Sequence, residues 1–287
     1  MRFWRLSVSL ALPVLAYILL IGFITLYQDQ LLFLPDPTPP SAENLRSGSG
    51  PSLTIWPPGS GSAFRGYVGA DDEVNRGWRG TLVLFHGNAG NGRDRTYYLG
   101  ALEPLGMRVI LAEYPGYGGR EGTPGEAILV DDGRETVRLA RAAFGEPLWV
   151  VGESLGAAVA AQVAVAPGVP ATGLVLITPW DNLPDLAQAI YWYLPARWLV
   201  HDRYDTRAAL QSFQGPKAVL IAGRDQIIPP AQSQRLYEAL PEPKRRWRVP
   251  EAGHNDWPFK VGMAWWGEVL AWLEATAPQV MKAPNSR

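Results

Sequence analysis

The chain has 287 residues, 47% of them hydrophobic, and its 26 Lys and Arg nearly balance its 27 Asp and Glu, for a net charge of −1. This length suits one large domain plus a short extension, and the lack of a basic surplus argues against a nucleic-acid partner. The sequence contains no cysteine, which excludes disulfides, thiolate metal sites and a cysteine nucleophile. No histidine pair or carboxylate cluster has metal-ligand spacing, so we expect neither a metal nor a cofactor.

The first element is an uncharged run over residues 6–26, in which only Ser7, Ser9 and Thr25 are clearly polar. As a helix this run would be about 31 Å long, close to the hydrocarbon thickness of a bilayer. We therefore expect a transmembrane anchor over residues 6–27. A cleaved signal peptide is the alternative, but its apolar region is usually shorter, and this run does not end in a cleavage site of the A-x-A kind.

The charges that flank this run predict its orientation. Arg2 and Arg5 precede it, and Asp29 follows it. Because cytoplasmic flanks carry the excess of Lys and Arg, residues 1–5 should lie in the cytoplasm of a single-pass membrane protein. The domain that follows should then lie across the membrane, which in a bacterial cell means the periplasm or the exterior.

Behind the anchor, residues 28–61 are predicted to form a linker, because most of this stretch is rich in Pro, Ser and Gly. Residues 62–277 form the predicted domain, and residues 278–287 form a C-terminal tail. From residue 81 onward, short apolar runs alternate with helix-like stretches.

The predicted strands are residues 53–56, 64–68, 81–85, 107–112, 148–151, 173–177, 218–222 and 246–249. The predicted helices are residues 93–104, 125–144, 155–166, 231–240 and 260–276. Short buried strands that alternate with helices indicate the α/β class: a mostly parallel sheet with helices on both faces.

Residues 152–156 read Gly-Glu-Ser-Leu-Gly, a G-x-S-x-G pattern between a predicted strand and a helix rich in small residues. In a nucleophile elbow a buried strand ends at a sharp, strained turn, a helix starts at once, and the serine hydroxyl projects from the apex. The two glycines let neighbouring backbone approach without a Cβ clash. Ser154 is therefore the predicted nucleophile. The alternative is a structural turn with an incidental serine.

A serine nucleophile needs a base, which an acid orients. The chain has three histidines, at positions 86, 201 and 254. In a strand–elbow–helix arrangement the triad follows the chain order Ser, then Asp or Glu, then His. Only His254, in a turn-rich loop after the last predicted strand, leaves room for a strand-borne acid between itself and Ser154.

Asp225 is the predicted acid, because it lies in a Gly-Arg-Asp turn after the run 218–222. Open α/β sheets carry their functional groups at the carboxyl ends of strands. Asp181, Asp202 and Asp205 are the alternatives. Asp181 is the strongest of them, because it also follows a strand-like run, but the turn favours Asp225.

The loop over residues 85–91 is rich in glycine and follows a predicted strand. An oxyanion needs two backbone donors, which we expect to be the N–H of Leu155 and the N–H of Asn88. His86 would then hold the loop in place rather than act as a second base. Such a loop can also bind phosphate, but this one lacks both the Lys-Ser/Thr of a P-loop and the G-x-G-x-x-G spacing.

Residues 180–213 separate two strands by more than one crossover helix needs. The segment holds five aromatic residues, Trp180, Tyr191, Trp192, Tyr193 and Trp198. Ile190, Tyr193 and Leu194 have the spacing of one apolar helical stripe. The segment is predicted either to pack its aromatics on the domain surface or to form a small lid over the serine. Such a lid would line an acyl-binding wall or dip into the membrane interface.

Taken together, the serine elbow and four further motifs resemble the α/β-hydrolase superfamily. These four are His86-Gly87-Asn88-Ala89-Gly90, Tyr114-Pro115-Gly116-Tyr117-Gly118, Gly223-Arg224-Asp225 and Gly253-His254. The chain looks like the membrane-anchored serine hydrolases related to the bud-emergence proteins and the α/β-hydrolase-domain depalmitoylases, and residues 30–35 also look like that group. The resemblance covers residues 28 to 277 or so. It implies the α/β-hydrolase fold and a serine-hydrolase reaction, and it leaves the substrate open.

The sequence therefore predicts a membrane-anchored serine hydrolase that cleaves carboxylic ester or thioester bonds through a Ser154-Asp225-His254 triad and an acyl-enzyme. The expected substrate is a small-molecule or lipid-like acyl compound, and no cofactor is required. An aminopeptidase-type amide hydrolase is the alternative enzyme, for which Glu153 is the one acidic residue noted near the serine. A non-catalytic, membrane-tethered binding protein on the same fold is the alternative from another class.

Overall fold

The computed structural model describes residues 2–46, 51–70, 77–168 and 171–282. An eight-stranded sheet runs through the domain in the order β10-β9-β8-β7-β4-β6-β3-β2. The strands are β2 (Leu53–Trp56), β3 (Gly66–Gly69), β4 (Gly80–Phe85), β6 (Met107–Ala112), β7 (Leu148–Glu153), β8 (Gly173–Ile177), β9 (Lys217–Ala222) and β10 (Lys244–Val249). Neighbours from β10 to β6 are parallel, and β3 and β2 add an antiparallel edge.

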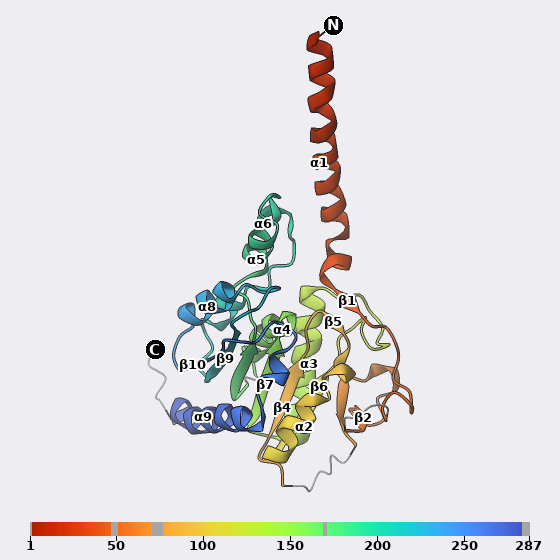
Figure 1. Cartoon of the computed structure of the whole chain (residues 1–287). Coiled ribbons are helices and arrows are strands. Elements are labelled where there is room, and N and C mark those ends of the chain that lie inside the picture. Colours follow the sequence, from red (N-terminus) through yellow and green to blue (C-terminus); the bar gives the residue numbers. More distant parts are fainter. Residues whose placement is uncertain (1, 47–50, 71–76, 169–170, 283–287) are drawn as a thin grey trace.

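Helices cover both faces of this sheet (Figure 1). The α-helices of the described residues are α1 (Arg2–Leu32), α2 (Tyr97–Leu102), α3 (Glu126–Phe144), α4 (Leu155–Ala164), α5 (Leu183–Ile190), α6 (Ala196–Leu199), α7 (Thr206–Leu210), α8 (Pro230–Ala239) and α9 (Met263–Lys282). One hydrophobic cluster packs α3, α4 and α8 on one face, and a second packs α2 and α9 on the other. The predicted mostly parallel, doubly covered sheet is confirmed. The strands β6 to β9 are buried along their whole length for this reason.

One predicted helix is broken into three pieces. Residues 93–104 form a 3₁₀ turn (Gly92–Arg95), then α2, then a second 3₁₀ turn (Glu103–Leu105). A capping box between Asn91 and Asp94 fixes the first turn. Gly106, with a φ of 79°, ends the second one in a conformation that glycine adopts without strain.

The helix α1 stands away from the domain (Figure 1). Its stretch Ala11–Leu32 is long and apolar enough to cross a membrane, and none of it is buried. The helix continues beyond the predicted end of the anchor at residue 27, through two polar residues that have partners on the domain. Gln28 donates to the carbonyl of Leu199 at 3.2 Å, and Asp29 pairs with His201 at 3.0 Å.

The segment after α1 is bound to the domain rather than free of it. Phe33 is buried in the core. The short strand β1 (Leu34–Pro35) then pairs in parallel with β5 (Ala89–Gly90), within the glycine-rich loop. This part of the predicted linker therefore positions a loop of the expected active site. Residues 47–50 of the linker and residues 283–287 of the tail lie outside the described residues.

Candidate active site

Ser154 lies at the apex of a strained turn between β7 and α4. Its φ of 55° and ψ of −119° are unusual for a residue with a side chain. The glycines around it are sterically required. A Cβ on Gly156 would lie 2.0 Å from the carbonyl oxygen of Phe85, and one on Gly152 would lie 2.2 Å from the carbonyl oxygen of Gly156. The local geometry is therefore that of a nucleophile elbow.

His254 and Asp225 are brought together from two separate loops. His254 Nδ1 lies 2.7 Å from Asp225 Oδ2. The other carboxylate oxygen, Oδ1, accepts hydrogen bonds from the N–H groups of Ile227 and Ile228 at 2.9 and 2.8 Å. Both side chains are largely shielded from solvent. Asp225 is thus held with one oxygen directed at the imidazole, as an orienting acid must be.

No hydrogen bond joins Ser154 to His254 among the described residues. In unliganded enzymes such contacts are often long and tighten only with substrate. The loop that binds Asp225 also reaches the serine, because Ile227 and Ile228 line the same cavity as Ser154. All three predicted triad residues follow strands of the parallel part of the sheet, β7, β9 and β10, at its carboxyl edge.

The alternative acids have other partners. The buried Asp181 faces Arg207 and Arg235, at 3.5 and 3.9 Å. Asp205 caps α7 by accepting from the N–H of Ala208. Asp202 accepts from the N–H of Glu126, and burial raises its pKa. Of the four candidate aspartates, Asp225 is the one bonded to His254.

The two predicted oxyanion donors, Asn88 and Leu155, line the cavity together with Ser154. The carbonyl of Asn88 accepts from the N–H of Leu34 at 2.9 Å and from the hydroxyl of Tyr117 at 2.8 Å. Its side-chain amide donates to the carbonyl of Leu32 at 2.8 Å. Among the hydrogen bonds of the described residues, none uses the N–H of Asn88 or of Leu155.

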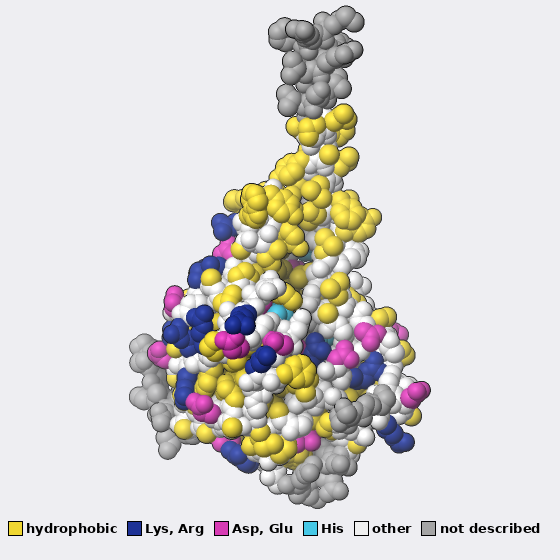
Figure 2. Space-filling model, viewed as in Figure 1, with side chains coloured by type: hydrophobic (Ala, Val, Ile, Leu, Met, Phe, Trp, Pro, Cys, Tyr) yellow, Lys and Arg dark blue, Asp and Glu magenta, His cyan; other side chains and the backbone are white. Residues whose placement is uncertain are grey.

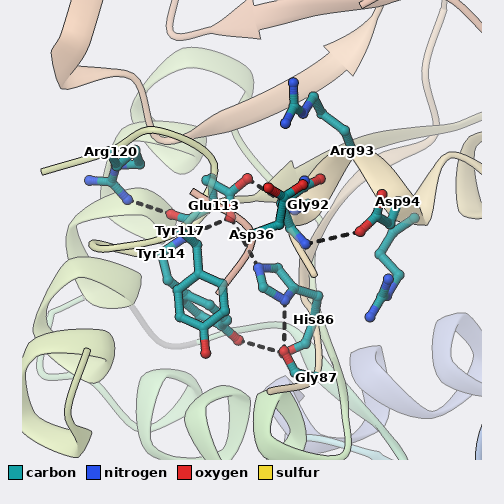
Figure 3. A network of polar contacts seen from close by, with 12 residues as sticks. Asp36, His86, Gly87, Gly92, Arg93, Asp94, Glu113, Tyr114, Tyr117 and Arg120 are labelled. Carbon is teal, nitrogen blue, oxygen red and sulfur yellow. Dashed lines mark hydrogen bonds and ion pairs between the residues drawn. The ribbon is translucent and has the colours of Figure 1, made fainter. Parts of the chain in front are cut away.

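His86 is buried behind this loop in a polar network (Figure 3). Its Nδ1 lies 2.7 Å from the carbonyl of Gly87, and its Nε2 lies 3.1 Å from a carboxylate oxygen of Glu113. The second oxygen of Glu113 accepts from the N–H of Gly92. Both ring nitrogens are therefore engaged in holding the loop, in line with the structural role expected for His86.

Glu113 was missed at the sequence level. It directly follows β6, so it stands at the same edge of the sheet as the triad residues. An acidic residue immediately after a buried strand was the signal that could have identified it. Figure 3 also shows Arg120 donating to the Glu113 carbonyl, and Arg120 forms a bidentate pair with Asp132 of α3.

Glu153, the residue before the predicted nucleophile, already has partners within the domain for both of its carboxylate oxygens. Its carboxylate pairs with Arg95 and accepts from the hydroxyls of Tyr97 and Tyr98 at 2.9 and 3.0 Å. Burial alone would raise the pKa of Glu153, but Arg95 and the two tyrosines outweigh it and hold the pKa below its usual range. The carboxylate is an internal ion pair, so it does not offer an amine-binding site.

A cavity of about 420 Å³ opens above Ser154. Most of its lining side chains are aliphatic and come from α1, the segment 183–200 and the loop after β9: Ile24, Leu31, Leu32, Leu183, Leu186, Ala187, Ile190, Leu194, Ala196, Leu199, Val200, Ile227 and Ile228. The N-terminal helix thus forms part of the cavity wall. Figure 2 shows apolar side chains gathered where this helix meets the domain.

The predicted apolar stripe in the segment 180–213 is wrong. The helix α5 ends at Ile190, and turns replace the expected further helical residues before Pro195 precedes α6. Leu194 is buried, whereas Ile190 and Tyr193 are exposed, so the three residues do not share one face. The segment nevertheless lines the cavity with α5 and α6, which is the position expected of a lid.

The comparisons with known proteins agree with this architecture. Residues 82–215 match a model of the alpha/beta hydrolase family. The uncharacterized protein Rv2307c of Mycobacterium tuberculosis is 34% identical over 277 residues, which cover 93% of this chain and 96% of that protein.

Two further similarities are more distant. The lysophosphatidylserine lipase ABHD12 of Danio rerio is 28% identical over 182 residues, 57% of this chain and 48% of its own length. An esterase of Pyrococcus furiosus has a similar fold, with a TM-score of 0.59 at 16% identity over 85% of this chain and 98% of the esterase. The chain belongs to the α/β-hydrolase family.

Proposed function

We propose that this protein is a membrane-anchored serine hydrolase that cleaves carboxylic ester or thioester bonds of a substrate with an apolar acyl chain. The observation that carries the proposal is the 2.7 Å hydrogen bond between His254 and Asp225, formed at the sheet edge where the strained Ser154 opens into an aliphatic cavity. Strain of this kind is retained where a catalytic group must be presented.

In the proposed reaction the Ser154 hydroxyl attacks the substrate carbonyl while His254 Nε2 takes its proton. Asp225 accepts the Nδ1–H of the imidazole, which fixes the tautomer and stabilises the imidazolium. The N–H groups of Asn88 and Leu155 donate to the oxyanion, where one donor typically contributes about 2.7–4 kcal/mol. His254 then protonates the leaving alcohol or thiol, and a water that it activates releases the acid from Ser154.

The lining of the cavity supports an acyl substrate. Burial of one methylene against aliphatic walls stabilises the bound acyl chain by about 0.8 kcal/mol. If the transition state keeps this contact, kcat/KM should rise about fourfold for each carbon added to the acyl chain until the cavity is full. A relative that carries the name of a lysophosphatidylserine lipase supports an ester of the lipid kind.

The membrane anchor is the second part of the proposal. The apolar, unburied stretch of α1 supports a single-pass anchor, and Arg2 and Arg5 ahead of it support a cytoplasmic N-terminus with the domain across the membrane. Full-length protein should remain with membranes after high-salt and carbonate washes. Protease added outside intact spheroplasts should digest the domain, and protection until lysis would mean the opposite orientation.

The aminopeptidase alternative finds less support, because Glu153 is engaged by Arg95, Tyr97 and Tyr98 and has no oxygen to spare for a substrate amine. A non-catalytic binding protein would have no need for an oriented histidine–aspartate pair beside a strained serine.

Active-site labelling tests the proposal directly. A fluorophosphonate probe should label Ser154, and Ser154→Ala should abolish both labelling and ester turnover, a loss of several orders of magnitude in kcat. Ser212→Ala, at an exposed serine, is the matched control and should behave like the wild type. A folded Ser154→Ala protein that hydrolyses p-nitrophenyl esters at the wild-type rate would refute the mechanism.

A further inference from the structure

The C-terminal half of the helix α1 contacts the segment that contains α5 and α6 at several points. At the tip of the segment, the hydroxyl of Tyr17 donates to the carbonyl of Tyr193 at 2.9 Å. At the base, Gln28 donates to the carbonyl of Leu199 and accepts from the N–H of His201. These contacts fix how far the segment extends along the anchor.

Between the tip and the base the contact is apolar. Buried residues of the segment, among them Leu194 and Ala196, form a small cluster of their own, and Ile21 and Ile24 of α1 pack against it. This cluster is separate from the two clusters that flank the sheet. The segment is therefore packed on the anchor helix as well as on the domain.

These contacts set the depth of the segment in a bilayer. Tyr17 lies nine residues before Leu26, the end of the uncharged run, and thus about 14 Å along the helix from that end. One leaflet of a hydrocarbon core is about 15 Å thick. If the run 6–26 spans the membrane, the tip of the segment beside Tyr17 lies within the leaflet nearest the domain.

The composition of the tip fits this position. Residues 186–196 carry no charge, and an ion pair between Asp185 and Arg197 flanks them at 2.8 Å. Trp192 and Trp198 are 78% and 82% exposed, and Ile190, Tyr191 and Tyr193 are also exposed. In Figure 2, apolar side chains are continuous from the helix onto the part of the domain next to it, above the charged surface. A tip without charged residues can enter the acyl layer, where Asp, Lys and Arg are strongly disfavoured.

The cavity above Ser154 lies between these two elements. Ile24 and Leu31 of α1 form part of its lining, Leu186 and Ile190 of α5 form another part, and Ser154 lines it as well. Ile24 and Ala187, which join α1 to α5, also line this cavity. An acyl chain that enters beside this contact would pass from the leaflet to aliphatic side chains.

We propose that α1 and the segment 183–200 together form a lateral entrance from the membrane, through which a lipid of the adjacent leaflet delivers its acyl chain to Ser154. The substrate is thus a membrane-resident acyl ester, and the segment is permanently inserted rather than a lid in water. The proposal rests on the proposed hydrolase function for its chemistry, but the insertion of the segment can be tested without it.

The first test measures insertion. Because the chain has no cysteine, Trp192→Cys in full-length protein can carry a single environment-sensitive fluorophore in phosphatidylcholine vesicles. Its emission should shift to the blue and be quenched by brominated acyl chains. The same label at Gln214→Cys, exposed at the opposite end of β9, should be quenched by aqueous iodide instead. Equal iodide quenching at both positions would overturn the proposal, whatever the catalytic activity.

The second test measures whether the segment is needed to bring a membrane-embedded ester to Ser154. Trp192 does not line the cavity, so Trp192→Asp should leave turnover of a short, water-soluble ester at the wild-type rate. Turnover of a long-chain ester embedded in vesicles should fall at least tenfold, and Trp192→Phe should restore it. Wild-type rates of Trp192→Asp on the embedded ester would refute lateral entry while the proposed hydrolase function stands. If wild-type protein cleaves neither ester, the hydrolase function fails, and the embedded-ester prediction fails with it.

Discussion

The imidazole of His254 and the carboxylate of Asp225 are 2.7 Å apart, and two backbone N–H groups hold the far oxygen of that carboxylate. Asp225→Asn should keep these backbone contacts but favour the wrong tautomer of the imidazole. We expect about a 10⁴-fold loss in kcat, measured on a soluble p-nitrophenyl ester, with little change in fold. Asp181→Asn is the matched control and should lose less than tenfold. The reverse order of the two variants would assign the acid to Asp181.

We expect Gly→Ala substitutions to have opposite effects on stability at two glycines, one in the elbow and one in α9. Gly156→Ala would bring its Cβ to 2.0 Å from the backbone of Phe85, which cannot move away as a side chain could. We expect a destabilisation of at least 1–3 kcal/mol, the order typical of overpacking. Gly267→Ala, in α9 with no atom near its Cβ, should instead stabilise the protein by about 0.5–1 kcal/mol. Thermal unfolding in detergent measures both, and a neutral Gly156→Ala would contradict the close packing.

Glu113 should contribute far more to the free energy of unfolding than a carboxylate of an exposed ion pair does. It is buried against His86 and the N–H of Gly92, so Glu113→Gln disturbs two buried hydrogen bonds and should cost about 1–3 kcal/mol in the free energy of unfolding. Glu135→Gln removes the partner of Arg138 on the surface of α3 and should change the free energy of unfolding far less, because exposed ion pairs contribute little. Equal losses in the two variants, by denaturant unfolding, would show that the network does not stabilise the loop.

We expect the contribution of the Glu153 carboxylate to the free energy of unfolding to be lost in acid. Its pKa in the folded protein lies below the ordinary value of 4.5, because Arg95 and two tyrosines outweigh its burial. A carboxylate of this kind stabilises the fold at pH values above its unfolded pKa, and the effect is lost as the pH falls through the folded pKa. Wild type should therefore be more stable than Glu153→Gln at pH 6, and the difference should shrink below pH 4.5. A difference that stays constant from pH 6 to pH 3 would contradict the pairing.

The parts of the molecule that sequence could predict are those fixed by local patterns. The boundaries of β6 and β8 coincide with the predicted apolar runs, because buried parallel strands need little beyond short hydrophobic segments. The edge strand β2 also has its predicted bounds. The elbow is also local, since the strand, the turn glycines and the small-residue helix are consecutive in the chain. Asp225 could be favoured over the other aspartates as the orienting acid because its turn follows such a strand.

The parts that could not be predicted depend on contacts between distant residues. Gln28 meets His201 across 173 positions, and this contact is one reason why α1 runs past residue 27. Tyr17 contacts Tyr193 across 176 positions. Sequence periodicity reports on single helices and strands, so it could not reveal that the segment packs on α1. The partners of Glu113 likewise come together only once β4 and β6 are neighbours in the sheet.

The residues just beyond α1 are hydrogen-bonded to Asn88, which bears on what happens to a domain separated from α1. The carbonyl of Leu32 accepts from the side chain of Asn88, and the N–H of Leu34 donates to the carbonyl of the same residue. Cleavage of the chain between Leu32 and Leu34 would therefore also remove the support of the loop that carries one proposed oxyanion donor. We expect a domain released from α1 in this way to lose its activity together with its attachment.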